Sequence, residues 1–389
     1  MVGLSIAIFF FNSKLYYQPK YIGNANHAVN QDVIEQLYFL KHEIHAGEAD
    51  KMQELFPEGF IFYNVIYGLT WCEMVAKLNR EDILYKEAIS EIDWTIKEVN
   101  SVKGREPFEG NLPFRYGAFY NGWTNLLLGQ KLQFQSEKER KNTDIEQFDV
   151  NCEQIVEAYL GNNNSYLETY NNEIWQADNI ICIASLALHD RIFGDKYQEL
   201  ISQLILKIKD DLDPKTGLIR HSKHEPSPRG SSQSLMNIFL KDIDSTFAKE
   251  QYERYKKNFF EKRSGLVFIR EYPKGVAGES DVDSGPVIWD IGGVASIVAI
   301  KAMAVNKDFA LAKNLRNNIE GLGFPVKIKG EKKYFLGQFS MADAFIAWSN
   351  VTEIDEKNVG FSVEKLYFHS ISIIFIFLLL LLTYRLWKF

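Results

Sequence analysis

Motifs that would assign a function directly are missing from this sequence. It has no Walker phosphate loop, no G-x-G-x-x-G, no C-x-x-C and no H-E-x-x-H. Cysteine is scarce: the three thiols, Cys72, Cys152 and Cys182, are odd in number and widely spaced. This pattern predicts neither a disulfide framework nor a zinc cluster, and buried inert thiols are the simpler interpretation. We therefore expect no metal and no cofactor.

An excess of positive charge is also absent. Asp and Glu outnumber Lys and Arg by 51 to 44, which gives a formal net charge of −7 at pH 7. Nucleic-acid-binding domains carry a basic patch or stripe, so we expect no nucleic-acid partner. What the chain has instead is apolar residues, 46% of its 389 positions. That is enough for a large core in one large domain or two ordinary ones.

The C-terminal part contains one long apolar run. Residues 369–384 include no charged side chain, and Tyr367 and Trp387 stand near its edges. About 20 apolar residues cross a bilayer, with aromatic residues at the two interfaces. The sequence therefore predicts a transmembrane helix over 366–387 that anchors the protein, preceded by a juxtamembrane linker over 351–365.

Flanking charges predict how this anchor is oriented. Arg385 and Lys388 follow the apolar run, so the positive-inside rule places that end in the cytoplasm and the folded domain outside it. The segment "VGLSIAIFFF" near the other end is too short to span alone and lacks a basic n-region. It could be a signal or anchor with its first residues missing, or a hydrophobic edge. A single-pass and a two-pass protein both stay open.

Helical periodicity recurs in pairs between these two ends. In each pair an amphipathic helix precedes one that is apolar on nearly every face and rich in small residues, as in "VIWDIGGVASIVAIKAMA". A helix that is apolar all round is buried, so the second helix of each pair is expected inside. The expected pairs are 31–46 with 59–78, 81–100 with 114–130, 144–160 with 173–190, 195–211 with 230–242, 246–261 with 285–304, and 308–319 with 336–349.

This arrangement predicts an all-α fold in which six helical hairpins close into an (α/α)6 toroid over residues 31–350. Residues 1–30 would be a hydrophobic segment and lead-in, and no internal linker indicates a second domain. Strand signals are confined to short stretches such as "GLIRH" and "GLVFIREY".

The segments just before the inner helices are the most polar and aromatic parts of the chain. In a ring they would meet at one rim, where six helix N-termini favour an anionic or hydroxyl-rich ligand. Aromatic rings, carboxylates and an arginine at one mouth are what a polar-ligand cleft requires. The segments read "FPEGFIFYN", "LPFRYGAFYNGW", "ETYNNEIWQADN", "HSKHEPSPRGSSQS", "ESDVDSGPVIWD" and "YFLGQFSMAD".

The fifth of these segments holds three acids, Glu279, Asp281 and Asp283, within five residues. Asp283 or Ser284 could cap the following helix, with Pro286 in its first turn. Capping needs one side chain, so the cluster exceeds it, and Asp281 is the better catalytic candidate, with Asp283 the second. Three carboxylates could also hold Ca²⁺, but the spacing lacks the EF-hand pattern.

The third segment places Asp178 inside an otherwise apolar helix. Burying this carboxyl is costly unless it is paired or functional, and burial would raise its pKa towards that of a general acid. Trp175 lies three residues earlier and shares its face. Arg115 or Arg229 could be a structural partner of Asp178, and Glu173 could compensate the helix dipole.

The fourth segment contains His221, His224 and Arg229. The histidine pair is weak support for a metal, whereas Arg229 before Gly230 resembles an anion clamp, because guanidinium and helix-start N–H groups both favour carboxylate or phosphate. Tyr63, Tyr116, Tyr120, Tyr170 and Trp289 could stack on a sugar ring or a lipid chain, and each of these could instead belong to the core. Further candidates for substrate binding are Arg115, Glu173 and Trp175.

From about residue 30 to 350 the chain resembles the six-hairpin (α/α)6 superfamily. Within it, "WQADN" is similar to the Trp-x-x-Asp inner-helix motif of unsaturated glucuronyl and rhamnogalacturonyl hydrolases, and "TGLIRHSKHEPSPRGSSQS" resembles that family's "GL…H…RG" segment. The resemblance implies that Asp178 is a general acid/base and that His221 and Arg229 belong to the substrate site. The family's second aspartate is absent from "YGAFYNGWTN".

A second resemblance is to the linalool dehydratase/isomerase group of toroids. "PRGSSQSLMNIFL" and "REYPKGVAGESDVDSGPV" are similar to segments of that wider group, whose site uses Tyr, His, Asp and paired cysteines. The cysteine pair has no counterpart here. Resemblance of fold does not by itself fix a reaction.

Three hypotheses follow from these patterns. The first is a membrane-anchored hydrolase or lyase that acts on an extracytoplasmic saccharide or glycan through Asp178 and Asp281 or Asp283. The second is a hydro-lyase or isomerase on an isoprenoid or other lipid alcohol. The third is a binding or scaffold protein without catalysis. An open polar groove would favour the first, a closed apolar pocket the second, and a fully ion-paired Asp178 the third.

Overall fold

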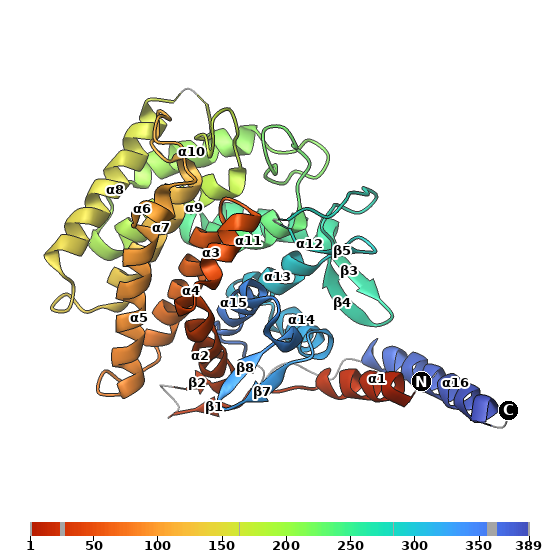
Figure 1. Ribbon diagram of the computed structural model, residues 1–389. Coiled ribbons are helices and arrows are strands. Elements are labelled where there is room, and N and C mark those ends of the chain that lie inside the picture. The colour runs from red at the N-terminus through yellow and green to blue at the C-terminus, as the bar shows by residue number, and fades with distance from the viewer. Residues whose placement is uncertain (1, 24–27, 163, 283, 356–363, 388–389) are drawn as a thin grey trace.

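The computed structural model describes residues 2–23, 28–162, 164–282, 284–355 and 364–387. Its centre is a closed ring of inner helices (Figure 1). Each inner helix contacts the next along the chain, and the last of them, α15, contacts the first, α4. The inner helices are α4 (Gly59–Val75), α7 (Gly117–Phe134), α9 (Gln176–Phe193), α11 (Gly230–Ile243), α13 (Gly293–Val305) and α15 (Ser340–Asn350).

An outer helix precedes each inner one and packs against the ring. The outer helices are α2 (Gln31–His45), α5 (Ile83–Val99), α8 (Asn142–Leu160), α10 (Gln198–Asp210), α12 (Ser245–Phe259) and α14 (Phe309–Leu322). The all-α class and the (α/α)6 toroid of six hairpins are therefore confirmed. The two ends of the toroid also meet: Asn30, just before α2, donates a hydrogen bond from Nδ2 to the carbonyl oxygen of Asn350, the last residue of α15, at 3.4 Å.

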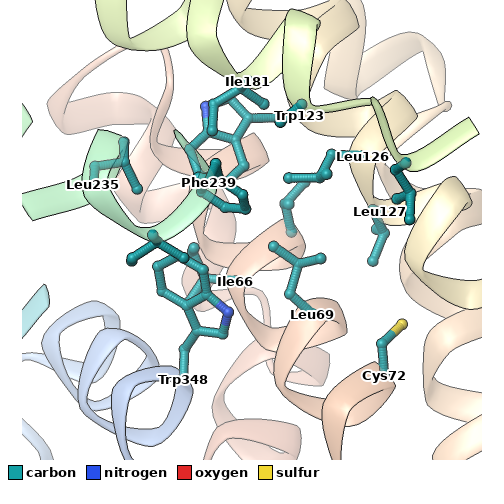
Figure 2. Close-up of a cluster of buried hydrophobic side chains, with 14 of the residues drawn as sticks. Ile66, Leu69, Cys72, Trp123, Leu126, Leu127, Ile181, Leu235, Phe239 and Trp348 are labelled. Carbon is teal, nitrogen blue, oxygen red and sulfur yellow. The ribbon is translucent and has the colours of Figure 1, made fainter. Parts of the chain in front are cut away.

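The middle of the ring is filled by side chains of the inner helices. Figure 2 shows apolar residues of α4, α7, α9, α11 and α15 pointing at one another, among them Leu69, Trp123, Phe239 and Trp348. Among the outer helices, α10 buries one stripe, made of Ile201, Leu204, Ile205 and Ile208, as the sequence predicted. The outer helix α14 differs, because α1 and β4 also pack on it and it is buried on its other faces as well.

Shorter elements connect these helices. They are α3 (Glu48–Leu55), α6 (Val102–Arg105), a 3₁₀ turn at Phe335–Gly337 and four antiparallel two-stranded hairpins: β1–β2 (Tyr21–Ile22, Val29–Asn30), β3–β4 (Phe260–Arg263, Leu266–Ile269), β5–β6 (Val287–Ile288, Ile291–Gly292) and β7–β8 (Val326–Ile328, Glu331–Lys333). In β3–β4, Phe260 pairs with Ile269, so the strand expected in "GLVFIREY" is present.

The strand expected in "GLIRH" is not formed by residues 217–221. Side-chain amides take the place of a partner strand at its centre: Gln251 Oε1 accepts from the Ile219 N–H at 3.0 Å, and Gln233 Nε2 donates to the Ile219 carbonyl at 2.7 Å. The backbone of this segment is therefore satisfied without a sheet.

Four inner helices begin later than expected, the second and third by three residues and the last two by more. The fifth was predicted from residue 285 but begins at Gly293, because residues 287–292 form the β5–β6 hairpin. Its two-residue turn holds Trp289 and Asp290 at φ 51° and 66°, a left-handed conformation that is not helical. The sixth was predicted from residue 336 and begins at Ser340, after the 3₁₀ turn.

Glycine opens two of the inner helices where another backbone crosses closely. A Cβ at Gly117 would lie 1.9 Å from the Thr169 carbonyl oxygen, and one at Gly230 would lie 1.9 Å from the Arg270 carbonyl oxygen. No side chain fits in either place. These contacts fix the segment before α9 against α7, and the segment after β4 against α11.

The two ends of the chain form helices that lie side by side (Figure 1). The N-terminal hydrophobic segment forms α1 (Val2–Lys14), which packs on α14 and on α16 (Glu364–Trp387). The Phe11 and Phe368 rings meet edge to face at 5.1 Å, and Lys365 Nζ donates to the Leu15 carbonyl at 2.8 Å. Among the described helices, α16 is the one long and apolar enough to cross a membrane, with a mean hydropathy of 2.4.

Candidate active site

The N-terminal turns of all six inner helices meet around one cavity of about 130 Å³. Each helix contributes to its wall: Phe62 of α4, Phe119 of α7, Ala177 and Asp178 of α9, Ser231, Ser232 and Leu235 of α11, Val294 and Val298 of α13, and Met341 and Phe345 of α15. The segments before these helices add Phe56, Glu58, Trp175, His221, Arg229, Asp281 and Ser284. Six segments far apart in the sequence therefore share one site.

Asp178 lies in the first turn of α9, buried in the wall of this cavity. Its Oδ2 accepts a hydrogen bond from Thr169 Oγ1 at 3.0 Å, and the Trp175 N–H donates to the same Thr169 hydroxyl oxygen at 3.4 Å. Thr169 is itself held by its backbone N–H, which donates to the Glu173 carbonyl at 2.9 Å. The carboxyl is thus oriented by a rigid turn, as a catalytic group requires.

Glu58 is a cavity carboxyl that the sequence did not single out. It stands just before α4, and the Tyr170 hydroxyl donates a short hydrogen bond to its Oε1. Burial raises the pKa of Glu58 above its usual value, against the opposing effect of the Tyr170 hydrogen bond. Its signal in the sequence was an acid directly before the apolar run "GFIFYN", in one of the rim segments.

His221 adds a neutral polar group to the cavity. Burial lowers the pKa of its imidazole to about 3, with help from the nearby positive charge of Arg229. Its Nδ1 lies 2.8 Å from Ser232 Oγ. The ring is therefore uncharged at neutral pH and offers one donor and one acceptor nitrogen to Ser232 and to a ligand.

Arg229 does not stand free as an anion clamp, because protein groups occupy its guanidinium. Its Nε donates to Glu271 Oε1 at 3.0 Å, its Nη2 to Ser284 Oγ at 2.8 Å, and its Nη1 makes a short ion pair with Asp281. The guanidinium also lies over the Tyr272 ring at 5.2 Å. Arg229 acts here as the hub that ties the loop of Asp281 to the start of α11.

The pKa values of Asp281 and Glu271 shift in opposite directions, although both carboxyls pair with Arg229. Burial opposes the charge on Asp281, yet hydrogen bonds from Arg229 and Ser284 outweigh it and hold the pKa of that carboxyl below its usual range. Burial dominates at Glu271 and raises its pKa to about 7, despite bonds from Ser231 and Arg229. Asp281 is therefore an ion-pair partner rather than a proton donor.

The other predicted site residues are dispersed. Tyr63 is fully buried in the core of α4, and Trp289 is 80% exposed at the β5–β6 turn. Tyr170 contacts two residues of the cavity wall: its hydroxyl donates to Glu58, and its ring meets the Trp175 ring edge to face at 5.8 Å. Glu173 Oε1 lies 3.4 Å from His224 Nε2 at the rim. Asp283 lies outside the described residues.

Arg115, Tyr116 and Tyr120 line a different hollow. They belong to a groove between α5 and α8, and not to the cavity of Asp178. Their segment turns outward because Tyr116 and Gly117 both have positive φ, 69° and 75°. The prediction that these three share the rim with Asp178 is therefore corrected.

Within the part of the chain that the structure describes, no group of three or more His, Cys, Asp or Glu side chains is placed to hold a metal ion. Cys72, Cys152 and Cys182 are all buried free thiols, and burial raises the pKa of each. The chemistry available in the cavity is accordingly that of carboxyl groups, one imidazole and hydroxyls.

Comparison with known proteins gives a likeness to solved structures only. No protein-family model matches the chain, and no curated protein matches it. Among solved structures, it is similar to a family 105 glycoside hydrolase of C. acetobutylicum ATCC 824, with 13% identity and a TM-score of 0.45 over 82% of this chain and 99% of that one.

Proposed function

We propose that the protein is an acid/base enzyme that acts on a saccharide bound in the cavity of Asp178. The observation that carries this proposal is that two carboxyls, Asp178 and Glu58, line one small cavity together with Trp175, Phe62 and Phe119. Paired carboxyls beside aromatic faces suit glycosidic acid/base chemistry, since sugars stack on rings while the carboxyls move protons.

In this proposal Glu58, rather than Asp281 as the sequence predicted, is the second carboxyl of the acid/base pair. In hydrolysis, one carboxyl gives its proton to the glycosidic oxygen as the C–O bond breaks. The other takes a proton from the water whose oxygen bonds to the same carbon. The raised pKa of Glu58 favours it as the donor at the start of the cycle, with Asp178, oriented by Thr169, as its partner.

The remaining polar groups support binding rather than proton transfer. Neutral His221 can donate to or accept from a sugar hydroxyl, while the Arg229 cluster holds Ser284 and Asp281 at the mouth. A cavity of about 130 Å³ that is walled by six helix ends admits the end of a sugar chain rather than its middle. We therefore propose action on a terminal unit.

The test is turnover by carboxamide variants. Asp178→Asn and Glu58→Gln keep shape and remove the proton, and each is expected to lower the release of reducing sugar from a panel of oligosaccharides by 10²-fold or more, on the order expected for losing an acid/base. Glu54→Gln, at an exposed position in α3, is the matched control. Unchanged turnover in both variants would contradict the proposal, and binding without any turnover would favour the scaffold hypothesis.

A second candidate is a hydro-lyase or isomerase on an isoprenoid or lipid alcohol. The observation that favours it is the apolar part of the cavity lining, made of Leu235, Val294, Val298, Met341 and Phe345. There, one carboxyl would protonate the hydroxyl that leaves as water, and the other would take a proton from the neighbouring carbon. Incubation with linalool distinguishes the two candidates: loss of water from linalool but no sugar release would replace the saccharide proposal.

We propose further that α16 anchors the ring in a membrane, with the ring on the extracytoplasmic side. Its length and exposed apolar surface support the span, and Arg385 and Lys388 support the orientation. The full chain is expected to stay with membranes after alkaline carbonate washing, and a chain ending at residue 355 to be released in larger part. Retention of both to the same extent would assign the attachment to another segment, with α1 the first to test.

A further inference from the structure

A second, larger cavity is a groove on the outside of the ring, between α5 and α8, and residues of α7 also line it. Its volume is about 1250 Å³, against about 130 Å³ for the candidate active site. Cavities that hold a drug-sized ligand are about 300–1,000 Å³. This groove therefore has room for a ligand of several linked units.

Carboxamides are the most frequent polar side chains in this groove. A carboxamide carries two donor hydrogens and one acceptor oxygen. The amide groups of Asn100, Asn121 and Asn162 donate to backbone carbonyls, and their side-chain oxygens keep acceptor capacity for a ligand. A sugar hydroxyl also donates and accepts, so a carboxamide can satisfy both of its needs. The carboxamides along the groove are Asn100, Asn121, Gln147, Asn151, Gln154, Asn162 and Asn164.

Charge at one end of the groove is neutralised within the protein. Lys131 bridges Asp93 and Asp144 at 2.5 and 2.6 Å, and Lys141 contacts Asp93 at 3.0 Å. Nucleic acids and other polyanions need a row of basic groups that is open to their phosphates. A peptide groove offers an open strand edge or apolar anchor pockets, and the lining here is helical and rich in amides. A neutral polar chain fits best.

Tyr116 gives the groove an aromatic platform, and its backbone is strained. Its φ is 69°, a region that a bulky side chain rarely adopts, and its half-buried ring carries the Arg115 guanidinium at 4.7 Å. The Tyr116 N–H donates to the Glu109 carbonyl at 3.0 Å, and Asn121 Nδ2 donates to the Arg115 carbonyl at 2.7 Å. Strain that the surroundings enforce in this way is typical of ligand sites.

A series of aromatic rings runs from this platform to the active-site cavity, with Tyr120 and Phe108 between Tyr116 and Phe119. Tyr116 meets Tyr120 at 5.5 Å, Tyr120 meets Phe108 at 5.4 Å, and Phe108 stacks on Phe119 at 5.6 Å. Phe119 lines the cavity of Asp178. A chain held on Tyr116 would thus lie close to the site where its end is processed.

We propose that the groove between α5 and α8 is a second binding site, for a neutral oligosaccharide chain, with Tyr116 as its stacking platform. This inference rests on the proposed saccharide activity and names its substrate class: a polymer that is held on the outside of the ring while one end enters the cavity.

The test is hexasaccharide binding to the full chain by calorimetry. The probes are maltohexaose, cellohexaose, xylohexaose, laminarihexaose and chitohexaose. Tyr116→Gly removes the ring but suits a left-handed backbone, so this variant is expected to fold with an unchanged or higher melting temperature. At least one probe should bind wild type and lose about tenfold or more in affinity in this variant, in line with the loss of one stacked ring. Tyr38→Ala, a half-exposed tyrosine on α2, is the matched control and should bind as wild type does.

Equal affinity in wild type and Tyr116→Gly overturns the groove site, and so does binding of none of the five probes. Asp178→Asn separates this result from the proposed activity. If Asp178→Asn abolishes turnover while Tyr116→Gly changes no affinity, the activity stands and the groove fails. If Tyr116→Gly weakens binding while Asp178→Asn leaves turnover intact, the groove stands as a binding site and the assigned chemistry fails.

Discussion

At the scale of single residues, one guanidinium meets two carboxyls that behave in opposite ways. Asp281 is half exposed and keeps its charge, whereas Glu271 is fully buried and holds its proton to about pH 7. Burial raises the pKa of both carboxyls, and Arg229 lowers both. The hydrogen bonds prevail at half-exposed Asp281, whereas the cost of removing water prevails at fully buried Glu271.

The raised pKa of Glu271 predicts a pH dependence of stability. Because its pKa moves from 4.5 to about 7, folding takes up a proton between these pH values. Its contribution is fully present below about pH 4.5 and is lost as the pH rises to about 7, by on the order of 3 kcal/mol. Glu271→Gln cannot titrate, so the difference in unfolding free energy between wild type and variant should change across this window. Parallel profiles in denaturant titrations at pH 4.5 to 7.5 would contradict this.

His221 should stay uncharged through the working range of pH. Burial lowers the pKa of its ring to about 3, so the ring gains a proton only well below its ordinary pKa of 6.5. In spectra of protein with labelled histidine, the His221 signal should not shift between pH 5 and 8. Loss of the signal in His221→Gln identifies it. A midpoint near pH 6.5 would show that the His221 ring is hydrated rather than buried, and would contradict this prediction.

At the scale of elements, the β5–β6 turn is a site where sequence and backbone disagree. Trp289 and Asp290 occupy the two left-handed positions of a hairpin turn that favours Asn and Gly. Trp289→Asn is expected to stabilise the protein by about 1 kcal/mol, since Asn adopts this conformation at lower cost. Thermal unfolding measures it, and Ile288→Asn, exposed and next to it in extended backbone, is the control. A lower melting temperature for Trp289→Asn would mean that the indole contributes a contact.

The six hairpins could be predicted because each pairs a one-sided with an all-round apolar helix. The residue at which a helix starts could not be predicted where glycine and proline allow a turn. The segment "SGPVIWDIGG" was predicted to be helical, but it contains the β5–β6 hairpin. Of the residues that line the candidate cavity, Asp178, Trp175, His221 and Arg229 could be singled out from the sequence because they are unusual in apolar surroundings. Glu58 was missed and Tyr116 misplaced, because a sequence does not show which way a connecting segment faces.

At the scale of the whole molecule, one lysine joins three inner helices at the end opposite the cavity. Lys301 Nζ of α13 contacts both Glu73 carboxylate oxygens of α4 at 2.6 and 2.7 Å and the Trp348 carbonyl of α15 at 3.3 Å. Lys301→Met should destabilise the ring by about 2–3 kcal/mol, because it leaves Glu73 without its cation in a largely buried place.

The paired variant Glu73→Leu/Lys301→Met is the control for that prediction. Removing both charges leaves no unpaired ion, so most of the lost stability should return in urea unfolding of the double variant. Equal losses in the single and double variants would show that packing of the lysine stem, rather than its charge, holds the three helices.

The contact between α15 and α4 has a consequence for how the protein is made. During synthesis α4 emerges early and α15 last of the inner helices, so the flank of α4 that α15 covers stays open until nearly the whole ring has left the ribosome. Until α15 has been made, the inner helices form an open ring, and the face of α4 that α15 will cover stays exposed. The final folding step therefore brings the first and the last inner helix together, and a chaperone would have to protect both edges of the open ring until then.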